Sequence, residues 1–179
     1  MPNATPRAPE DRLSGPASRD PSLYSRRHLR WGWSLLLLFL TLGLVLEALH
    51  GFKVAEYMNP SNSTRRLLWT LAHAHGTLLG LVNLGFVLTV PLLPAWEGRS
   101  RDLASSCLIS ASILMPAGFF LGGATPHAGD PGLGILAVPA GGALLLIAVA
   151  LVARAAARPM STERARRLDP ARAKKAGPS

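Results

Sequence analysis

The chain has 179 residues, about the length of one domain, with 19 Lys or Arg against 10 Asp or Glu. Fourteen of the basic residues lie in residues 1–30 and 154–179, and nearly all long apolar runs lie between these tails. The tails lack the interleaved aromatic residues that stack on bases, so we expect them to bind anionic lipid headgroups and no nucleic acid. The single cysteine, Cys107, excludes an intrachain disulfide and a covalent c-type haem site.

The middle of the chain contains four apolar runs that are long enough to cross a bilayer. A helix needs about 20 residues to cross about 30 Å of hydrocarbon, and continuous runs without alternation favour helices over barrel strands. The first run is not expected to be a cleaved signal peptide, because about 30 mostly polar residues precede it. The predicted fold class is therefore all-α, a four-helix transmembrane bundle. We expect a disordered tail at 1–29, a membrane domain at 30–155 with spans at 31–52, 67–93, 103–124 and 133–153, and a basic tail at 156–179.

The distribution of Lys and Arg predicts the orientation in the membrane, since cytoplasmic segments carry the excess of positive charge. With both termini in the cytoplasm, 16 basic residues lie inside and three lie outside. We therefore expect a multi-pass protein with N-in, C-in topology, most consistent with a bacterial inner membrane. Tryptophans near the span ends are expected to form an aromatic belt at the interfaces, namely Trp31, Trp33, Trp69 and Trp96.

In this topology, the polar residues of the spans and loops collect in the outer half of the membrane domain. Ionisable groups are costly inside a bilayer, so such residues are candidates for function. Glu47 and His50 are three apart and share a helix face near the outer end of the first span. We expect His28, which lies among arginines, to be a plain tail residue. The outer cluster comprises Glu47, His50, His73, His75, His127 and Asp130.

The second span carries a narrow stripe of small residues, and its Gly-x-x-x-Gly at Gly76 and Gly80 permits close helix approach. Asn83 on the same stripe predicts a hydrogen bond between helices. His73 and His75 are about 200° apart around the helix, so they flank the stripe on opposite sides and cannot both face the same neighbour.

The third span and the outer loop after it offer further small and polar residues. Ser106 and Ser110 are expected to form a second small-residue face, and Pro116 is expected to kink the helix. The Gly- and Pro-rich loop at 122–134 is either a lid over the outer site or a simple turn. No hydrolase elbow, zincin motif, phosphate loop or nucleotide fingerprint is present, so no catalytic residue is assigned and an enzyme is not favoured.

Residues 72–83 read Ala-His-Ala-His-Gly-Thr-Leu-Leu-Gly-Leu-Val-Asn. This segment resembles the helix that bears a haem-ligating histidine in subunit I of haem-copper oxidases and nitric oxide reductases. The resemblance implies haem b with His75 as axial ligand, or His73 as the alternative. That family has many more spans, so a complete oxidase is excluded and a small, dimeric haem-binding relative is implied. The layout of spans is also similar to four-helix membrane mutases that act on hydroxylamino-aromatics.

The outer cluster leads to three hypotheses. The first is a protein of electron transfer or respiratory-complex assembly that binds haem b or a metal ion. Its ligands are His75, His73 and His50, supported by Glu47, Asn83, His127 and Asp130 as orienting or proton-relay groups. The second is a non-catalytic scaffold or accessory subunit, either a homodimer or part of a membrane complex. The third is a small enzyme or transporter that uses Glu47 and His50 for proton transfer.

Overall fold

The structure of the chain, a computed structural model, describes residues 21–127 and 129–158. Within these ranges it has four long helices, each apolar and long enough to cross a membrane. They are α1 (Pro21–Gly51), α3 (Ser63–Leu92), α4 (Arg99–Ala124) and α5 (Ala137–Ala156), joined by the short turns α2 (Ala55–Met58), η1 (Pro60–Asn62) and η2 (Leu133–Leu136). The predicted all-α four-helix bundle is confirmed, and helix length and composition are those of a multi-pass membrane protein.

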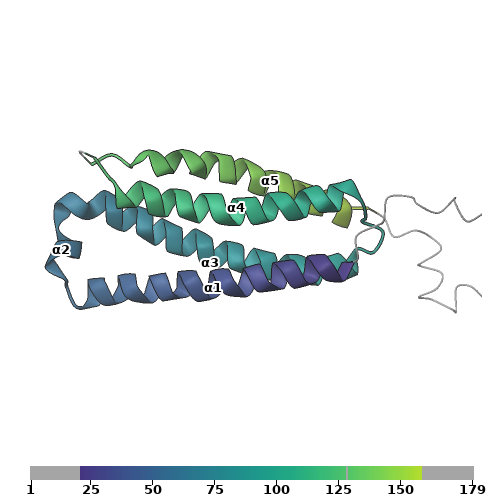
Figure 1. Cartoon of the computed structure of the whole chain (residues 1–179), viewed down its shortest axis with the longest axis horizontal. Coiled ribbons are helices and arrows are strands. Elements are labelled where there is room, and N and C mark those ends of the chain that lie inside the picture. Colours follow the sequence, from purple (N-terminus) through teal and green to yellow (C-terminus); the bar gives the residue numbers. More distant parts are fainter. Residues whose placement is uncertain (1–20, 128, 159–179) are drawn as a thin grey trace, which may run out of the picture.

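Consecutive long helices pack side by side: α1 lies along α3, α3 along α4, and α4 along α5 (Figure 1). The start of α1, the connection from α3 to α4 and the end of α5 lie at one end of the bundle (Figure 1). The connections from α1 to α3 and from α4 to α5 lie at the other end. Because α1 and α4 both pack on α3 but meet each other at few points, a space is left between them.

The first helix begins earlier than the sequence predicts. A disordered tail was expected up to residue 29, whereas α1 already begins at Pro21. Proline suits the first turn of a helix, where its missing N–H has no helical partner to lose. Hydropathy alone misses these turns because they carry arginines, but the arginines lie on the exposed side of α1 while Tyr24 and His28 are buried. The rest of both predicted tails lies outside the described residues.

The predicted small-residue stripe of α3 is confirmed, and it is the surface on which α1 packs. Its members are buried: Ala72, Gly76, Gly80 and Asn83. A Cβ atom placed on Gly80 would lie 3.1 Å from the carbonyl oxygen of Gly32 in α1, and one on Gly76 would overlap the ring of Phe39. The absence of side chains at these glycines therefore allows the two helices to approach closely.

The small-residue face predicted for α4 is wrong, because a different set of serines faces the core. Ser106 is exposed and Ser110 only partly buried, whereas the buried serines are Ser105 and Ser112. Small residues surround this helix on several sides, so their spacing alone does not select the face that packs. The helix continues through Pro116 as one element.

An apolar core joins α3, α4 and α5 near the end of the bundle where α1 begins. Its buried members are Phe86, Val90, Trp96, Ala104, Cys107, Leu108, Ala148 and Ala155. Trp96 was expected in an interfacial belt, but it is only 3% exposed, its indole N–H donates to Ser100 Oγ at 2.9 Å, and its ring meets Phe86 edge-on. The outer surfaces of the helices expose many leucines, which is compatible with contact to lipid.

We expect Gly76→Ala to lower the free energy of unfolding by about 1–3 kcal/mol, because the added methyl group overlaps Phe39 in α1. The matched control is Gly85→Ala in the same helix, where a Cβ meets nothing within 4 Å. The control is expected to be neutral or to stabilise by up to about 1 kcal/mol, because alanine favours helix. Thermal unfolding in mild detergent compares the two variants, and equal midpoints would contradict the close packing of α1 on α3.

Candidate functional site

Three polar residues from three different helices are 0% exposed: His28 of α1, Asn83 of α3 and Ser105 of α4. His28 lies between the other two. Its Nδ1 lies 2.7 Å from Oδ1 of Asn83 in α3, and its Nε2 lies 2.7 Å from Oγ of Ser105 in α4. An amide oxygen only accepts hydrogen bonds, so Nδ1 carries the proton and Nε2 of the neutral ring accepts the hydroxyl proton of Ser105. One imidazole therefore joins three helices.

The hydrogen bonds continue in both directions from His28. Arg27 Nη2 donates to Ser105 Oγ at 2.5 Å. On the other side, Asn83 Nδ2 donates to Ser112 Oγ at 2.8 Å, and the Ser112 hydroxyl donates to the carbonyl of Leu108 at 2.7 Å. Every donor in this series meets an acceptor, which is the condition for a buried polar group to be stabilising. We call Arg27, His28, Asn83, Ser105 and Ser112 the polar network.

A second set of contacts ties the beginning of α1 to the first turn of α4. The Tyr24 hydroxyl donates to the carboxylate of Asp102, and the guanidinium of Arg101 lies 4.9 Å from the centre of the Tyr24 ring. Asp102 also suits the positive end of the α4 dipole. Arg101 is 4% exposed, and its Nε has no partner among the described residues.

The sequence prediction for His28, a plain tail residue, is wrong. The sequence does contain a signal for its burial. The buried face of α1 continues with helical spacing through the arginine-containing first turns, at Tyr24, His28, Gly32, Leu35 and Phe39. Hydropathy averages over all faces of a helix, so it does not detect a buried face that lies opposite arginines.

The predicted outer residues lie on separate elements and surfaces. Glu47 and His50 are exposed near the end of α1, and His127 and Asp130 are exposed in the loop after α4. Within the described residues, no group of three or more His, Cys, Asp or Glu side chains is placed to hold a metal ion. In this loop the backbones of His127 and Asp130 exchange hydrogen bonds of 3.0 and 2.9 Å, and the carbonyl of Gly129 accepts a hydrogen bond from Thr64 of α3.

His73 and His75 point to different neighbours, as their angular separation predicts. Nδ1 of His73 bonds to the carbonyl of Phe39 in α1 at 2.6 Å. Nδ1 of His75 bonds to the carbonyl of Leu71 in its own helix at 2.9 Å, and its ring packs 4.8 Å from that of Phe119 in α4. In both rings Nδ1 therefore donates to a carbonyl, and in a neutral imidazole this arrangement puts the lone pair on Nε2.

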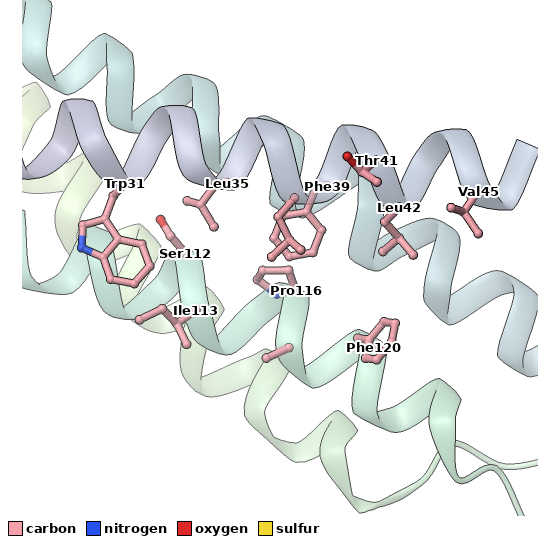
Figure 2. Close-up of a pocket in the computed structure, with 12 residues that line it drawn as sticks. Trp31, Leu35, Phe39, Thr41, Leu42, Val45, Ser112, Ile113, Pro116 and Phe120 are labelled. Carbon is pink, nitrogen blue, oxygen red and sulfur yellow. The ribbon is translucent and has the colours of Figure 1, made fainter.

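An apolar groove lies between α1 and α4 and has a volume of about 580 Å³ (Figure 2). Side chains from the two helices face each other across it. Some of the side chains that line the groove are exposed on the surface of the bundle: Leu38 is 61% and Ile113 44% exposed. We call this space the α1–α4 groove; it is lined by Trp31, Leu35, Leu38, Phe39, Thr41, Leu42 and Val45 of α1 and by Ser112, Ile113, Pro116, Ala117 and Phe120 of α4.

The fold and composition place the chain in the class of small multi-pass α-helical membrane proteins. No protein-family model matches the sequence, and comparison with curated proteins and with solved structures gives no match.

We expect His28 and Asn83 to be energetically coupled. Asn83→Ala leaves the Nδ1–H of His28 without an acceptor and removes the hydrogen bond that Ser112 Oγ accepts, at a cost of about 1–3 kcal/mol. His28→Ala is expected to cost a similar amount, and the double variant less than the sum by about 0.5–2 kcal/mol. Equilibrium unfolding in mixed detergent and SDS micelles measures the cycle.

The control for this cycle is Thr89→Val in α3, because the Thr89 hydroxyl bonds only to a carbonyl of its own helix. This change is expected to stay within about 0.5 kcal/mol. Additive effects of His28→Ala and Asn83→Ala would show that the network does not act as a unit.

Proposed function

We propose that the chain is a non-catalytic, multi-pass membrane protein that binds a membrane lipid in the α1–α4 groove. The observation that carries this proposal is the groove itself, an apolar space that opens on the outer surface of the bundle. A groove on the membrane-facing side of a transmembrane helix pair is reached from the bilayer, so its ligand can enter from the hydrocarbon phase. Such a protein serves as an accessory or scaffold subunit.

The polar groups near the groove support an apolar ligand. The Ser112 hydroxyl already accepts from Asn83 and donates to Leu108, and the Thr41 hydroxyl donates to the carbonyl of Leu37 at 2.7 Å. His28 is fully buried, and both of its ring nitrogens are bonded. These hydroxyls and this imidazole are thus engaged with the protein, which favours binding over chemistry.

The length of the groove supports an acyl chain as its ligand. From Trp31 to Val45 it follows α1 for about 21 Å at 1.5 Å per residue. One leaflet of the hydrocarbon core is about 15 Å thick, half of about 30 Å. An extended acyl chain that enters at the headgroup level is therefore in contact with the groove along the depth of its leaflet.

The distribution of charge supports an orientation with both termini in the cytoplasm. The start of α1 and the end of α5 lie at the same end of the bundle (Figure 1). That orientation leaves 16 basic residues inside and three outside, as the positive-inside rule requires. We propose a bacterial inner membrane as the location.

A second candidate function, binding of haem b or a metal ion, is favoured by one observation. In His73 and His75, Nδ1 is held by a backbone carbonyl, which is the usual arrangement of a histidine that ligates a metal through Nε2. Because the two rings face different helices, they fit single axial ligands and not one shared ion. In this proposal a second ligand comes from another copy of the chain or from a partner subunit.

Glu47 and His50 do not line the α1–α4 groove, and their role in proton transfer remains a prediction.

We expect Ala117→Trp to reduce lipid retention about tenfold, because the indole fills the α1–α4 groove and a loss of about 1.4 kcal/mol corresponds to a factor of ten. The matched control is Ala150→Trp, at an exposed position of α5 outside the groove. Native mass spectrometry of the protein, extracted from membranes in mild detergent, counts the bound lipids. Retention that is equal in both variants would contradict lipid binding in this groove.

The haem proposal is tested by a reduced-minus-oxidised visible spectrum of the same preparation, together with elemental analysis. If haem binds, a Soret band and an α-band are expected, and the bands should be lost in the variant that removes the axial ligand, His75→Ala or His73→Ala. Absence of both bands and of any stoichiometric metal would end this proposal.

A further inference from the structure

An arginine-lined hollow adjoins one end of the α1–α4 groove. The described residues that line it all belong to the first turns of α1. Trp31 lines both spaces, so the hollow and the groove adjoin each other at this residue. The hollow is lined by Arg26, Arg27, Arg30, Trp31 and Ser34, and we call it the arginine pocket.

The pocket and the groove occupy one face of α1. Arg26, Arg30, Ser34, Leu38 and Val45 follow one another at spacings of four or seven residues, which places them along one side of a helix. This face is basic for its first turns and apolar afterwards. A ligand that lies along it meets positive charge at one end and hydrocarbon side chains along the rest.

Two of the three arginines have no protein partner in the part of the chain that the structure describes. Arg27 donates to Ser105 in the polar network, whereas no hydrogen bond or ion pair of Arg26 or Arg30 exists there. Both are exposed. Their guanidinium groups are therefore available to a ligand, and a guanidinium matches the geometry of phosphate oxygens through paired N–H donors.

We propose that the arginine pocket and the α1–α4 groove form one binding site for an anionic glycerophospholipid. Arg26 and Arg30 bind the phosphate, Trp31 lies at the level of the glycerol backbone, and one acyl chain follows the groove towards Val45. The charge of the pocket and the apolarity of the groove together select this ligand. A free anion gains nothing from the groove, and a zwitterionic lipid presents an ammonium group that the arginines repel. This inference rests on the proposed function and specifies the class of lipid.

The test is competition between phosphatidylglycerol and phosphatidylcholine with the same acyl chains, supplied as an equal mixture to the full chain in detergent. The bound lipids are counted by native mass spectrometry. The wild type is expected to bind at least about fivefold more phosphatidylglycerol. In Arg26→Gln/Arg30→Gln this ratio should fall to about one, because the groove still accepts either lipid once the positive charge that favours a net-negative headgroup is gone.

The matched control is Arg154→Gln/Arg158→Gln, which removes the same charge from exposed positions at the same end of the bundle. It is expected to keep the wild-type ratio. Arg26→Lys/Arg30→Lys keeps the charge but loses the paired donors, and it should show an intermediate ratio. This variant also replaces the glutamine variant if the latter fails to fold.

The outcomes separate this inference from the proposed function. Equal binding of both lipids by the wild type, with loss of both in Ala117→Trp, overturns the anionic preference and leaves lipid binding in the groove intact. An equal fall of the ratio in the Arg154/Arg158 control shows general attraction to basic surfaces and also overturns the inference. A wild-type protein that carries no lipid, or a dimer that carries none, overturns both.

Discussion

Three helices of this bundle are held in place by one buried imidazole. In a bilayer there is little hydrophobic drive for helices to associate, because lipid tails are as apolar as leucine. What remains is close packing and hydrogen bonding, and both hold α1 in this bundle. The glycines of α3 allow α1 to approach closely, and His28 of α1 bonds to Asn83 in α3 and to Ser105 in α4. Because these bonds have direction, they determine the rotation of α1 about its own axis as well as its position. The fourth long helix, α5, lacks such a connection in the described residues and packs on α4 through apolar contacts.

The position of the polar network also explains why a groove exists. The network holds the first half of α1 against α3 and α4, and the glycine contacts keep the second half on α3. The groove between α1 and α4 then extends from the point where the network ends, at Ser112, towards Phe120 (Figure 2). Turning the side chains of α1 that pack on α3 into this groove would require α1 to rotate, which would break the bonds of His28. The same constraint that gives the bundle a defined arrangement therefore leaves an apolar space open to the membrane.

The sequence predicts the parts of this structure that depend on one helix at a time. Four spans, the small-residue stripe of α3 and the opposite orientation of His73 and His75 all follow from composition and helical period. The role of His28 does not, because it depends on partners 55 and 77 residues away and on a helix start that arginines conceal from hydropathy. The predicted topology puts Glu47, His50, His127 and Asp130 at one depth in the membrane. Depth does not specify the direction in which a side chain points, so residues at one level need not converge.

The wide sequence separation within the polar network has a consequence for biogenesis. The first helix of the chain leaves the ribosome with His28 on its packing face, but Ser105 follows 77 residues later. At about 5–20 residues per second, this interval lasts about 4–15 s. During that time the imidazole has no partner from α4, and a polar ring on the packing face of α1 has to find its hydrogen bonds with water or headgroups instead. The first turns of the nascent α1 are therefore expected to stay in the interfacial layer, and the rotation of α1 becomes fixed only when the third long helix arrives.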